Sequence, residues 1–299
     1  MTRSPNRSAA RNASLSSRKS PPVTVHLRKM YVDCRYGQLH LHTAFPSNGG
    51  FDERTPLICI HPGPLSGSVF RALLPDLGSD RSVYAPDLPG CGESDAPPEA
   101  LTIAEYAAAV GDLLDTLRLR QVDVLGYQAG SLVAAELALS RPDQVRRAVF
   151  AGVPVFDARE RETFNTRPWP GKAREDGSHL VEEWQRIRRS RGASAPLGRL
   201  GEDLAAALRA GDTAAWLPSA AANYAAGERL PLLRQPMLVM RAKDEFWEMT
   251  ARADALLRDA RRVDLEGHNG GLFDTGAADV ARYVREFLGV RPGGYVQRT

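Results

Sequence analysis

The sequence lacks an apolar run long enough to cross a membrane. A helix needs about 18 or more consecutive apolar residues to span the bilayer, and Glu136 interrupts the best candidate in this chain. The sequence therefore predicts no membrane-spanning segment and no membrane partner.

Cysteine is also scarce. The three cysteines, Cys34, Cys59 and Cys91, are scattered, odd in number and not spaced as metal ligands. Structural disulfides are rare in reducing compartments, so this usage predicts a cytoplasmic protein without them. There is no glycine-rich phosphate loop, and the histidines are not grouped as metal ligands, so neither a cofactor nor a metal is predicted.

A strong net charge is missing from the body of the chain. The formal charge is +3, but five of the 39 Lys and Arg residues lie in Met1–Pro22, which leaves 34 bases against 36 acids. A near-neutral body does not predict a nucleic-acid surface. Residues 1–22 offer no apolar face and no apolar signal segment, so we expect a disordered basic tail.

What the chain does contain is an alternation of strand-like and helix-like segments. Two strand patterns, Lys29–Arg35 and Gln38–Phe45, predict a hairpin. Apolar strand runs and amphipathic helices then alternate, including expected helices at about 66–77 and 250–259. We expect a core of residues 23–153 and 232–290, a helical lid of residues 154–231 inserted between two strands, and a tail at 291–299.

One stretch, Val122 to Ala138, joins a β-branched run to an Ala/Leu helix through a Gly-x-x-x-Gly turn. Gly126 and Gly130 lack a Cβ atom, which allows a sharp strand-to-helix turn. This is the layout of a nucleophile elbow, in which the central residue points into the active site. In an esterase that residue is serine. Here it is Gln128, whose carboxamide is not a nucleophile.

Four landmarks occur in one order: His61-Pro-Gly-Pro64, Asp87-Leu-Pro-Gly-Cys-Gly-Glu-Ser-Asp95, Gly126-Tyr-Gln-Ala-Gly130 and Gly267-His268. With them the chain resembles the α/β-hydrolase fold family over about residues 31–288. The resemblance implies an α/β fold, with a mostly parallel sheet of about eight strands, helices on both faces and a helical lid.

The resemblance also implies roles for individual residues. His268 matches the catalytic histidine and Asp244 the acid that orients it, with Asp157 as the alternative acid. The backbone N–H groups of Gly63 and Ala129 match the oxyanion hole. Gln128 departs from the family pattern, so a covalent acyl-enzyme is not expected.

Other hydroxyl and thiol groups near these motifs are not expected to replace the missing serine. Ser131 lies one helical turn past the elbow tip, where its side chain should face the sheet. Cys91 and Ser94 belong to a loop rich in turn-forming residues.

A substrate pocket is expected between core and lid, because aromatic residues gather in both segments. The residues expected to line it are Pro64, Tyr127, Trp169, Trp184, Trp216 and Phe246.

Three functions remain open at this point. In the first, a His–Asp general base activates water, without a serine nucleophile, against a small and largely apolar carbonyl compound, ester, lactone or epoxide. In the second, the same dyad serves a lyase, isomerase or cyclase. In the third, the protein is a catalytically inactive ligand-binding or scaffold protein. The sequence leaves the substrate and the oligomeric state open.

Overall fold

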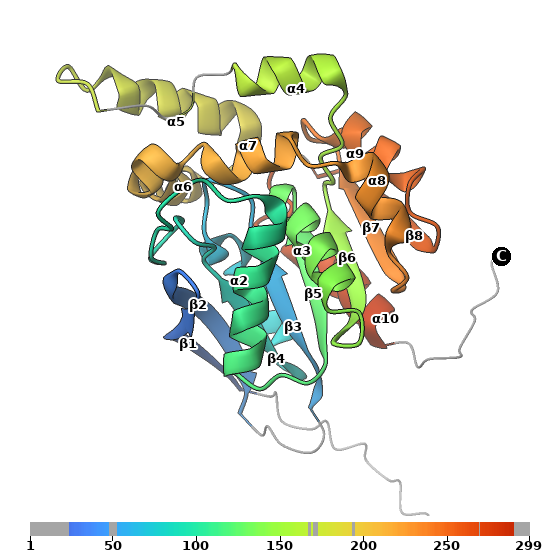
Figure 1. Cartoon of the computed structure of the whole chain (residues 1–299). Coiled ribbons are helices and arrows are strands. Elements are labelled where there is room, and N and C mark those ends of the chain that lie inside the picture. The colour runs from blue at the N-terminus through green and yellow to red at the C-terminus, as the bar shows by residue number, and fades with distance from the viewer. Residues whose placement is uncertain are drawn as a thin grey trace, which may run out of the picture.

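The computed structural model describes residues 24–47, 53–166, 169, 173–192, 195–268 and 270–289. The two predicted tails, residues 1–22 and 291–299, lie outside the described residues. Within these ranges the chain forms one sheet with helices on both faces (Figure 1).

The sheet has eight strands, and its order is β1-β2-β4-β3-β5-β6-β7-β8. The strands are β1 (Val25–Cys34), β2 (Gly37–Pro46), β3 (Arg54–Ile60), β4 (Arg81–Pro86), β5 (Val122–Tyr127), β6 (Val145–Ala151), β7 (Met237–Ala242) and β8 (Ala260–Leu265). β2 pairs antiparallel with β1 and β4, and the remaining pairs are parallel. The predicted hairpin and the mostly parallel sheet of about eight strands are confirmed.

The central strands are buried on both faces because their apolar side chains alternate between two cores. Ile58 and Val124 face a core that includes α2 (Ile103–Thr116), α3 (Ala129–Ser140) and α9 (Trp247–Asp254). Leu57 and Leu125 face the opposite core, which α1 (Leu74–Leu77) and α10 (Ala277–Gly289) complete. This alternation follows from the two-residue period of a strand.

Two predicted helices differ from those in the structure. The segment expected as one helix over 66–77 is a 3₁₀ turn, η1 (Gly67–Phe70), followed by the short α1. Pro75 accounts for the break, because proline has no N–H to continue the helix but fits the first turn of a new one. The helix expected at 250–259 is α9 (Trp247–Asp254), which begins and ends earlier than expected, and residues 255–259 connect it to β8.

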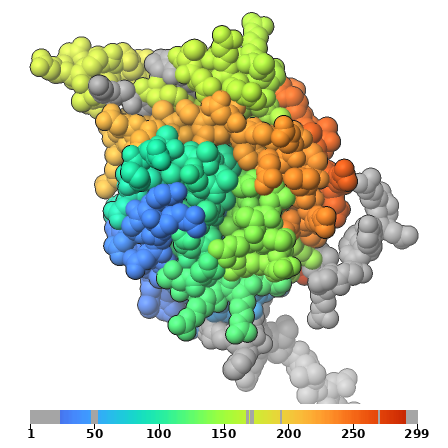
Figure 2. Space-filling model, in the orientation of Figure 1, coloured from blue at the N-terminus to red at the C-terminus, as the bar shows by residue number. Residues whose placement is uncertain are grey.

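Between β6 and β7 the described residues form five α-helices and two short 3₁₀ helices, η2 (Gly211–Thr213) and η3 (Leu230–Leu232). The α-helices are α4 (Ala158–Asn165), α5 (Ser178–Arg191), α6 (Leu197–Ala210), α7 (Trp216–Ala222) and α8 (Ala226–Arg229). Most of them cover the end of the sheet at which β5 and β6 finish (Figure 1). Figure 2 shows them as a layer of yellow-green to orange atoms across one side of the body. A side-chain hydrogen bond of 2.7 Å from Tyr224 to Glu136 attaches this layer to α3. None of the helices in the described ranges is long and apolar enough to cross a bilayer.

The turn between β5 and α3 is packed without space for side chains at its two glycines. A Cβ atom at Gly126 would lie 2.4 Å from the backbone oxygen of Gly130. One at Gly130 would lie 2.1 Å from the backbone oxygen of Ile60, in β3. These distances are far below van der Waals contact, so the two glycines allow α3 to touch the neighbouring strands.

The close packing at Gly130 predicts that one added methyl group lowers the stability of the fold. Gly130→Ala should lower the free energy of unfolding by about 1–3 kcal/mol or more, because the added atom overlaps backbone that cannot easily move. Gly201→Ala is the control, because that exposed position in α6 has nothing within 4 Å of the added Cβ. It should be neutral or stabilising by up to about 1 kcal/mol. Urea unfolding compares the two, and equal effects would contradict the steric argument.

Candidate active site

Gln128 stands at the tip of the elbow, directly after β5 and at the N-cap of α3. Its backbone has φ 49° and ψ −118°, a positive φ that is rare outside glycine. Such strain costs of order 1–3 kcal/mol and persists only where surrounding packing fixes it. Gln128 therefore has the backbone geometry of an elbow nucleophile, but a carboxamide in place of the hydroxyl.

The nearby hydroxyl and thiol groups are engaged elsewhere. Ser131 is 1% exposed, and its hydroxyl lies 2.9 Å from the Gly126 carbonyl oxygen, to which it donates. Ser94 donates to the backbone oxygen of Asp87 at 2.7 Å. Burial raises the pKa of the Cys91 thiol to about 12, so it stays protonated at neutral pH. None of these three groups is placed as a substitute nucleophile.

Asp244 follows β7 and approaches Gln128. A Cβ atom at Gly152 would lie 3.5 Å from Cγ of Gln128 and 3.8 Å from Oδ2 of Asp244, so this glycine leaves room for both side chains. Oδ1 of Asp244 accepts a hydrogen bond of 2.9 Å from the backbone N–H of Phe246. Oδ2 is buried and has no hydrogen-bond partner among the described residues.

Burial raises the pKa of the Asp244 carboxyl to about 6, and the negative charge of Glu245 adds to the effect. The side chain of Gln128 and the Phe246 N–H act in the opposite direction. A carboxyl group with a pKa near neutrality can both accept and return a proton, which is what a general base requires.

The alternative acid, Asp157, has a structural role. It is the N-cap of α4, where its Oδ1 accepts a hydrogen bond of 2.8 Å from the backbone N–H of Glu160. The Glu160 carboxylate accepts from the Asp157 N–H in return, which completes a capping box. Of the two candidate acids, only Asp244 lies beside Gln128.

His268 is placed differently from the expectation. Its backbone oxygen accepts a hydrogen bond of 2.9 Å from the N–H of Lys243, next to Asp244. Its ring, however, lies with Nε2 3.0 Å from Oδ2 of Asp279, in the first turn of α10. The expected hydrogen bond between His268 and Asp244 is not made. Asp279 is only partly buried, and its contacts with His268 and Arg282 hold the pKa of its carboxyl below the usual value, whereas burial disfavours the charged form of Asp244.

A pocket opens above the elbow, with about 680 Å³ of unfilled space that includes water at its mouth. Residues from the β3 loop, the elbow, the inserted helices and the β7 loop line it: Pro62, Gly63, Pro64, Leu65, Gln128, Ala129, Pro154, Phe156, Phe164, Trp169, Arg186, Ile187, Ser190, Arg191, Asp203, Pro218, Ala221, Glu245 and Phe246. The wall thus brings together Gln128, both oxyanion-hole candidates and three of the six residues expected to line a pocket, Pro64, Trp169 and Phe246.

The other three expected lining residues, Tyr127, Trp184 and Trp216, are not part of this wall. The Tyr127 ring packs 4.8 Å from that of Phe273 in the core on the other face of the sheet, and its hydroxyl accepts a hydrogen bond of 3.4 Å from Nε2 of Gln128. Trp184 packs against a small apolar cluster within the inserted helices. Trp216 is the first residue of α7. The period of each strand or helix determines the direction in which these side chains point. A prediction based only on the number of aromatic residues does not take that direction into account.

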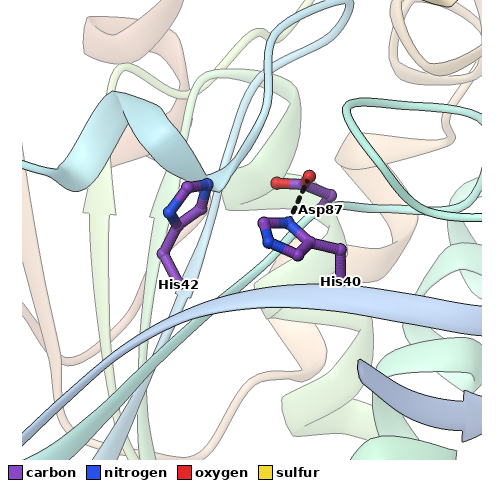
Figure 3. Close-up of side chains that lie close together, drawn as sticks. All are labelled: His40, His42 and Asp87. Carbon is purple, nitrogen blue, oxygen red and sulfur yellow. Dashed lines mark hydrogen bonds and ion pairs between the residues drawn. The ribbon is translucent and has the colours of Figure 1, made fainter. Parts of the chain in front are cut away.

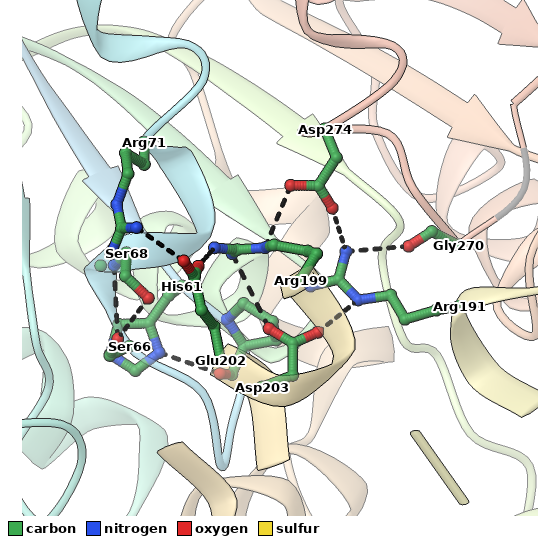
Figure 4. A network of polar contacts seen from close by, with 12 residues as sticks. His61, Ser66, Ser68, Arg71, Arg191, Arg199, Glu202, Asp203, Gly270 and Asp274 are labelled. Carbon is green, nitrogen blue, oxygen red and sulfur yellow. Dashed lines mark hydrogen bonds and ion pairs between the residues drawn. The ribbon is translucent and has the colours of Figure 1, made fainter. Parts of the chain in front are cut away.

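A charged cluster, made of Arg191, Arg199, Asp203 and Asp274, borders the pocket (Figure 4). Arg191 ends α5 and is 5% exposed. Its Nε lies 2.7 Å from Asp203, and its Nη1 lies 2.9 Å from Asp274 and donates to the Gly270 carbonyl oxygen at 3.0 Å. Its Nη2 is buried without a hydrogen-bond partner in the described structure.

The buried Nη2 of Arg191 favours contact with an oxygen atom. A buried guanidinium N–H without an acceptor carries a desolvation cost, which an oxygen of a ligand can remove. Because Arg191 also lines the pocket, its guanidinium can donate a hydrogen bond to an anionic or carbonyl oxygen of a ligand.

Sequence reasoning missed Arg191, Asp203, Arg186 and Glu245. In the sequence, Arg191 closes an Arg-Arg-Ser-Arg run that is typical of a solvated helix end. Its burial depends on partners 12 to 83 residues away. No local signal identifies it.

Comparison with known proteins agrees with this geometry. The alpha/beta hydrolase fold family matches residues 55–233, and the chain belongs to that family. The 2-hydroxymuconate semialdehyde hydrolase of Pseudomonas sp. (strain CF600) is 37% identical over 111 residues, 36% of this chain and 38% of that protein. The pimeloyl-[acyl-carrier protein] methyl ester esterase of Aeromonas hydrophila subsp. hydrophila is 32% identical over 125 residues, 41% of this chain and 45% of that protein.

Thus the chain spans less than half the length of these curated relatives. Among solved structures, the enol-lactonase from Burkholderia xenovorans LB400 has a TM-score of 0.72 at 18% identity, covering 87% of this chain and 100% of that one. At this identity the likeness concerns the fold alone.

The raised pKa of Asp244 predicts a pH-dependent stability. Between the ordinary value of 3.8 and about 6, the unfolded chain releases this proton while the folded chain keeps it, so stability falls as pH rises through that window. Asp244→Asn removes the ionisation but keeps an acceptor for the Phe246 N–H. At pH 7–8 it should therefore raise the free energy of unfolding by about 1–3 kcal/mol. Urea unfolding of both proteins from about pH 3.5 to 8 measures this difference in the free energy of unfolding. The difference should disappear near about pH 3.5, where Asp244 is protonated in the folded and the unfolded chain.

Proposed function

We propose that this protein is a hydrolase for a small carbonyl compound, ester or lactone that carries a carboxylate, and that it works by general-base catalysis without a serine nucleophile. The observation that carries the proposal is the proximity of Gln128 at the elbow tip to the Asp244 carboxyl, whose pKa is about 6 and whose Oδ2 makes no hydrogen bond among the described residues. Water held between these two side chains is the nucleophile.

The reaction proceeds in two steps. Asp244 accepts a proton from this water as the water oxygen bonds to the carbonyl carbon. It then returns the proton to the leaving oxygen or carbon as the bond to that atom breaks. Gln128 offers a carbonyl acceptor and two N–H donors, which suit it to orient the water.

The negative charge that develops on the carbonyl oxygen needs donors. Ala129 is the first residue of α3, where a backbone N–H has no partner within the helix. Gly63 lies across the same pocket. We assign the oxyanion hole to these two N–H groups, as in the family pattern.

Arg191 supplies the preference for an acid. Its unpaired Nη2 favours a substrate carboxylate, while Phe164 and Trp169, with rings 5.4 Å apart, favour a flat apolar body. The relative named for hydrolysing 2-hydroxymuconate semialdehyde is, by that name, an enzyme for an acid of this kind.

The inserted helices, residues 154–231, are assigned the role of a lid over the core formed by residues 23–153 and 232–290. They contribute Arg191 and the aromatic wall, so the pocket is complete only when they cover the elbow. A cytoplasmic location stays a prediction.

The test of the base is a panel of activated esters, lactones, β-diketones and epoxides, with variants assayed on the substrate that turns over. Asp244→Asn should lower kcat by about 10²–10⁴-fold, the usual contribution of a general base. His268→Gln should lower it less than about threefold, because that ring is held by Asp279. If His268→Gln is as damaging as Asp244→Asn, His268 leaves Asp279 during turnover and the expected His–Asp dyad is the base.

A second measurement tests the role of Arg191 with matched substrates, an acid and its methyl ester. Arg191→Lys should reduce kcat/KM for the acid by about 10–10²-fold relative to the ester, the value of a charge-assisted hydrogen bond. Arg199→Lys is the control, because Arg199 contacts Asp274 in the same cluster but does not line the pocket. Its effect should be equal on both substrates. An equal effect of Arg191→Lys on both would contradict the assignment.

One observation favours a second candidate, a protein that binds the same acids without turnover. The His268 ring pairs with Asp279 and leaves Asp244 without the imidazole partner that the family pattern implies. Under this candidate the panel gives no product, but titration with the acids still shows binding that Arg191→Lys weakens.

A further inference from the structure

His40, His42 and Asp87 lie together outside the pocket (Figure 3). His40 and His42 are two apart on β2, so both side chains project from the same face of the strand. Their rings lie 4.8 Å apart, nearly perpendicular to each other. Asp87 follows β4, which pairs with β2. The potential ligand atoms of the three residues all lie within 4.8 Å of one another. The spacing of the histidines in the sequence predicts no such group, which forms only because β2 pairs with β4.

Asp87 determines the state of His40. Its carboxylate accepts hydrogen bonds from the backbone N–H groups of Gly67 and Glu93, at 2.7 and 2.9 Å, and lies 2.9 Å from Nδ1 of His40. In the neutral tautomer of His40 that donates from Nδ1 to this carboxylate, Nε2 carries the lone pair.

That Nε2 atom has no hydrogen-bond partner among the described residues, although His40 is 1% exposed. In Figure 3 it points toward His42. A carboxylate that holds one nitrogen of a histidine while the other faces outward is the arrangement that orients metal-binding histidines in proteins.

His42 provides the second nitrogen. It lies two residues from His40 on the same face of β2 and is only partly buried, so its neutral ring offers a nitrogen lone pair, as a metal ligand must. The nearby positive charges are those of Lys29 and Arg71. Arg71 is paired with Glu202 at 2.7 Å, and the negative charge of Asp87 offsets the remaining repulsion of a cation.

We propose that His40 and His42 bind a divalent metal ion of the zinc type, with Asp87 orienting His40 and water completing the coordination. Imidazole nitrogen is a preferred ligand of Zn²⁺, at about 2.0–2.1 Å, which places two tetrahedral nitrogens about 3.4 Å apart. His42 is partly exposed, so a rotation of its ring can close the gap to His40.

A bound ion stabilises the folded chain through β2 and, through Asp87, the turns at Gly67 and Glu93. The site is separate from the pocket, because neither histidine nor Asp87 lines it. Zinc binding and hydrolysis can therefore be measured independently.

The test uses the untagged full-length protein and Zn²⁺. Titration calorimetry should show one equivalent bound, and zinc at 100-fold above Kd should raise Tm by about 2–8 °C. His42→Gln should weaken binding by at least about 100-fold. His26→Gln is the matched control, because His26 is exposed on the neighbouring strand β1, and it should bind as the wild type does.

X-ray absorption at the zinc edge provides the second readout, which should show two imidazole ligands and no sulfur. Unchanged affinity in His42→Gln, or sulfur scattering that points to Cys34, would overturn the proposal. So would the absence of zinc binding in wild-type protein that is folded by circular dichroism.

Discussion

The contact between α3 and the strands beside it is the constraint on which the rest of the structure depends. Because Gly126 and Gly130 have no side chains, the first turn of α3 rests directly on the backbone of β3 and β5. That contact fixes the positive φ of Gln128 and puts its side chain at the floor of the pocket. The elbow is thus built by its glycines, and the residue at its tip can change from serine to glutamine without loss of the turn.

Two buried groups give the site its polarity. Asp244, beside Gln128 and outside the pocket wall, has an oxygen that favours a proton, and Arg191, in the wall, has an N–H group that favours an acceptor. Both act on the buried hydroxyl of Tyr127, whose pKa is raised by burial and by Asp244 and lowered by Arg191. A substrate with an acid at one end and a carbonyl at the other suits this pair better than a neutral one does.

The parts of the structure that could be predicted from the sequence are those with local causes. The hairpin, the strand-to-helix turn and the inward direction of Ser131 each depend on residues within a few positions of one another. The break in the helix expected over 66–77 also had a local signal, Pro75 itself. The prediction followed the apolar periodicity of that segment and did not use the proline.

What could not be predicted depends on a balance between distant groups. The ring of His268 lies against Asp279 and not Asp244, and the contact with Asp279 exists only because α10 packs beside the loop of His268. Likewise, His40 and His42 become neighbours of Asp87 only through the pairing of β2 with β4. In both cases the residues are visible in the sequence, but the helix packing and the strand order that govern their chemistry are not.

The hydrogen bond from Arg191 to the Gly270 carbonyl joins the end of α5 to the loop that carries His268. The two segments are also in close steric contact, since a Cβ atom at Gly270 would lie 2.2 Å from the backbone oxygen of Ser190. An outward displacement of α5 would therefore break this hydrogen bond or displace Gly270, two residues from His268. The end of α5 and the segment at Gly270 are, in mechanical terms, one unit.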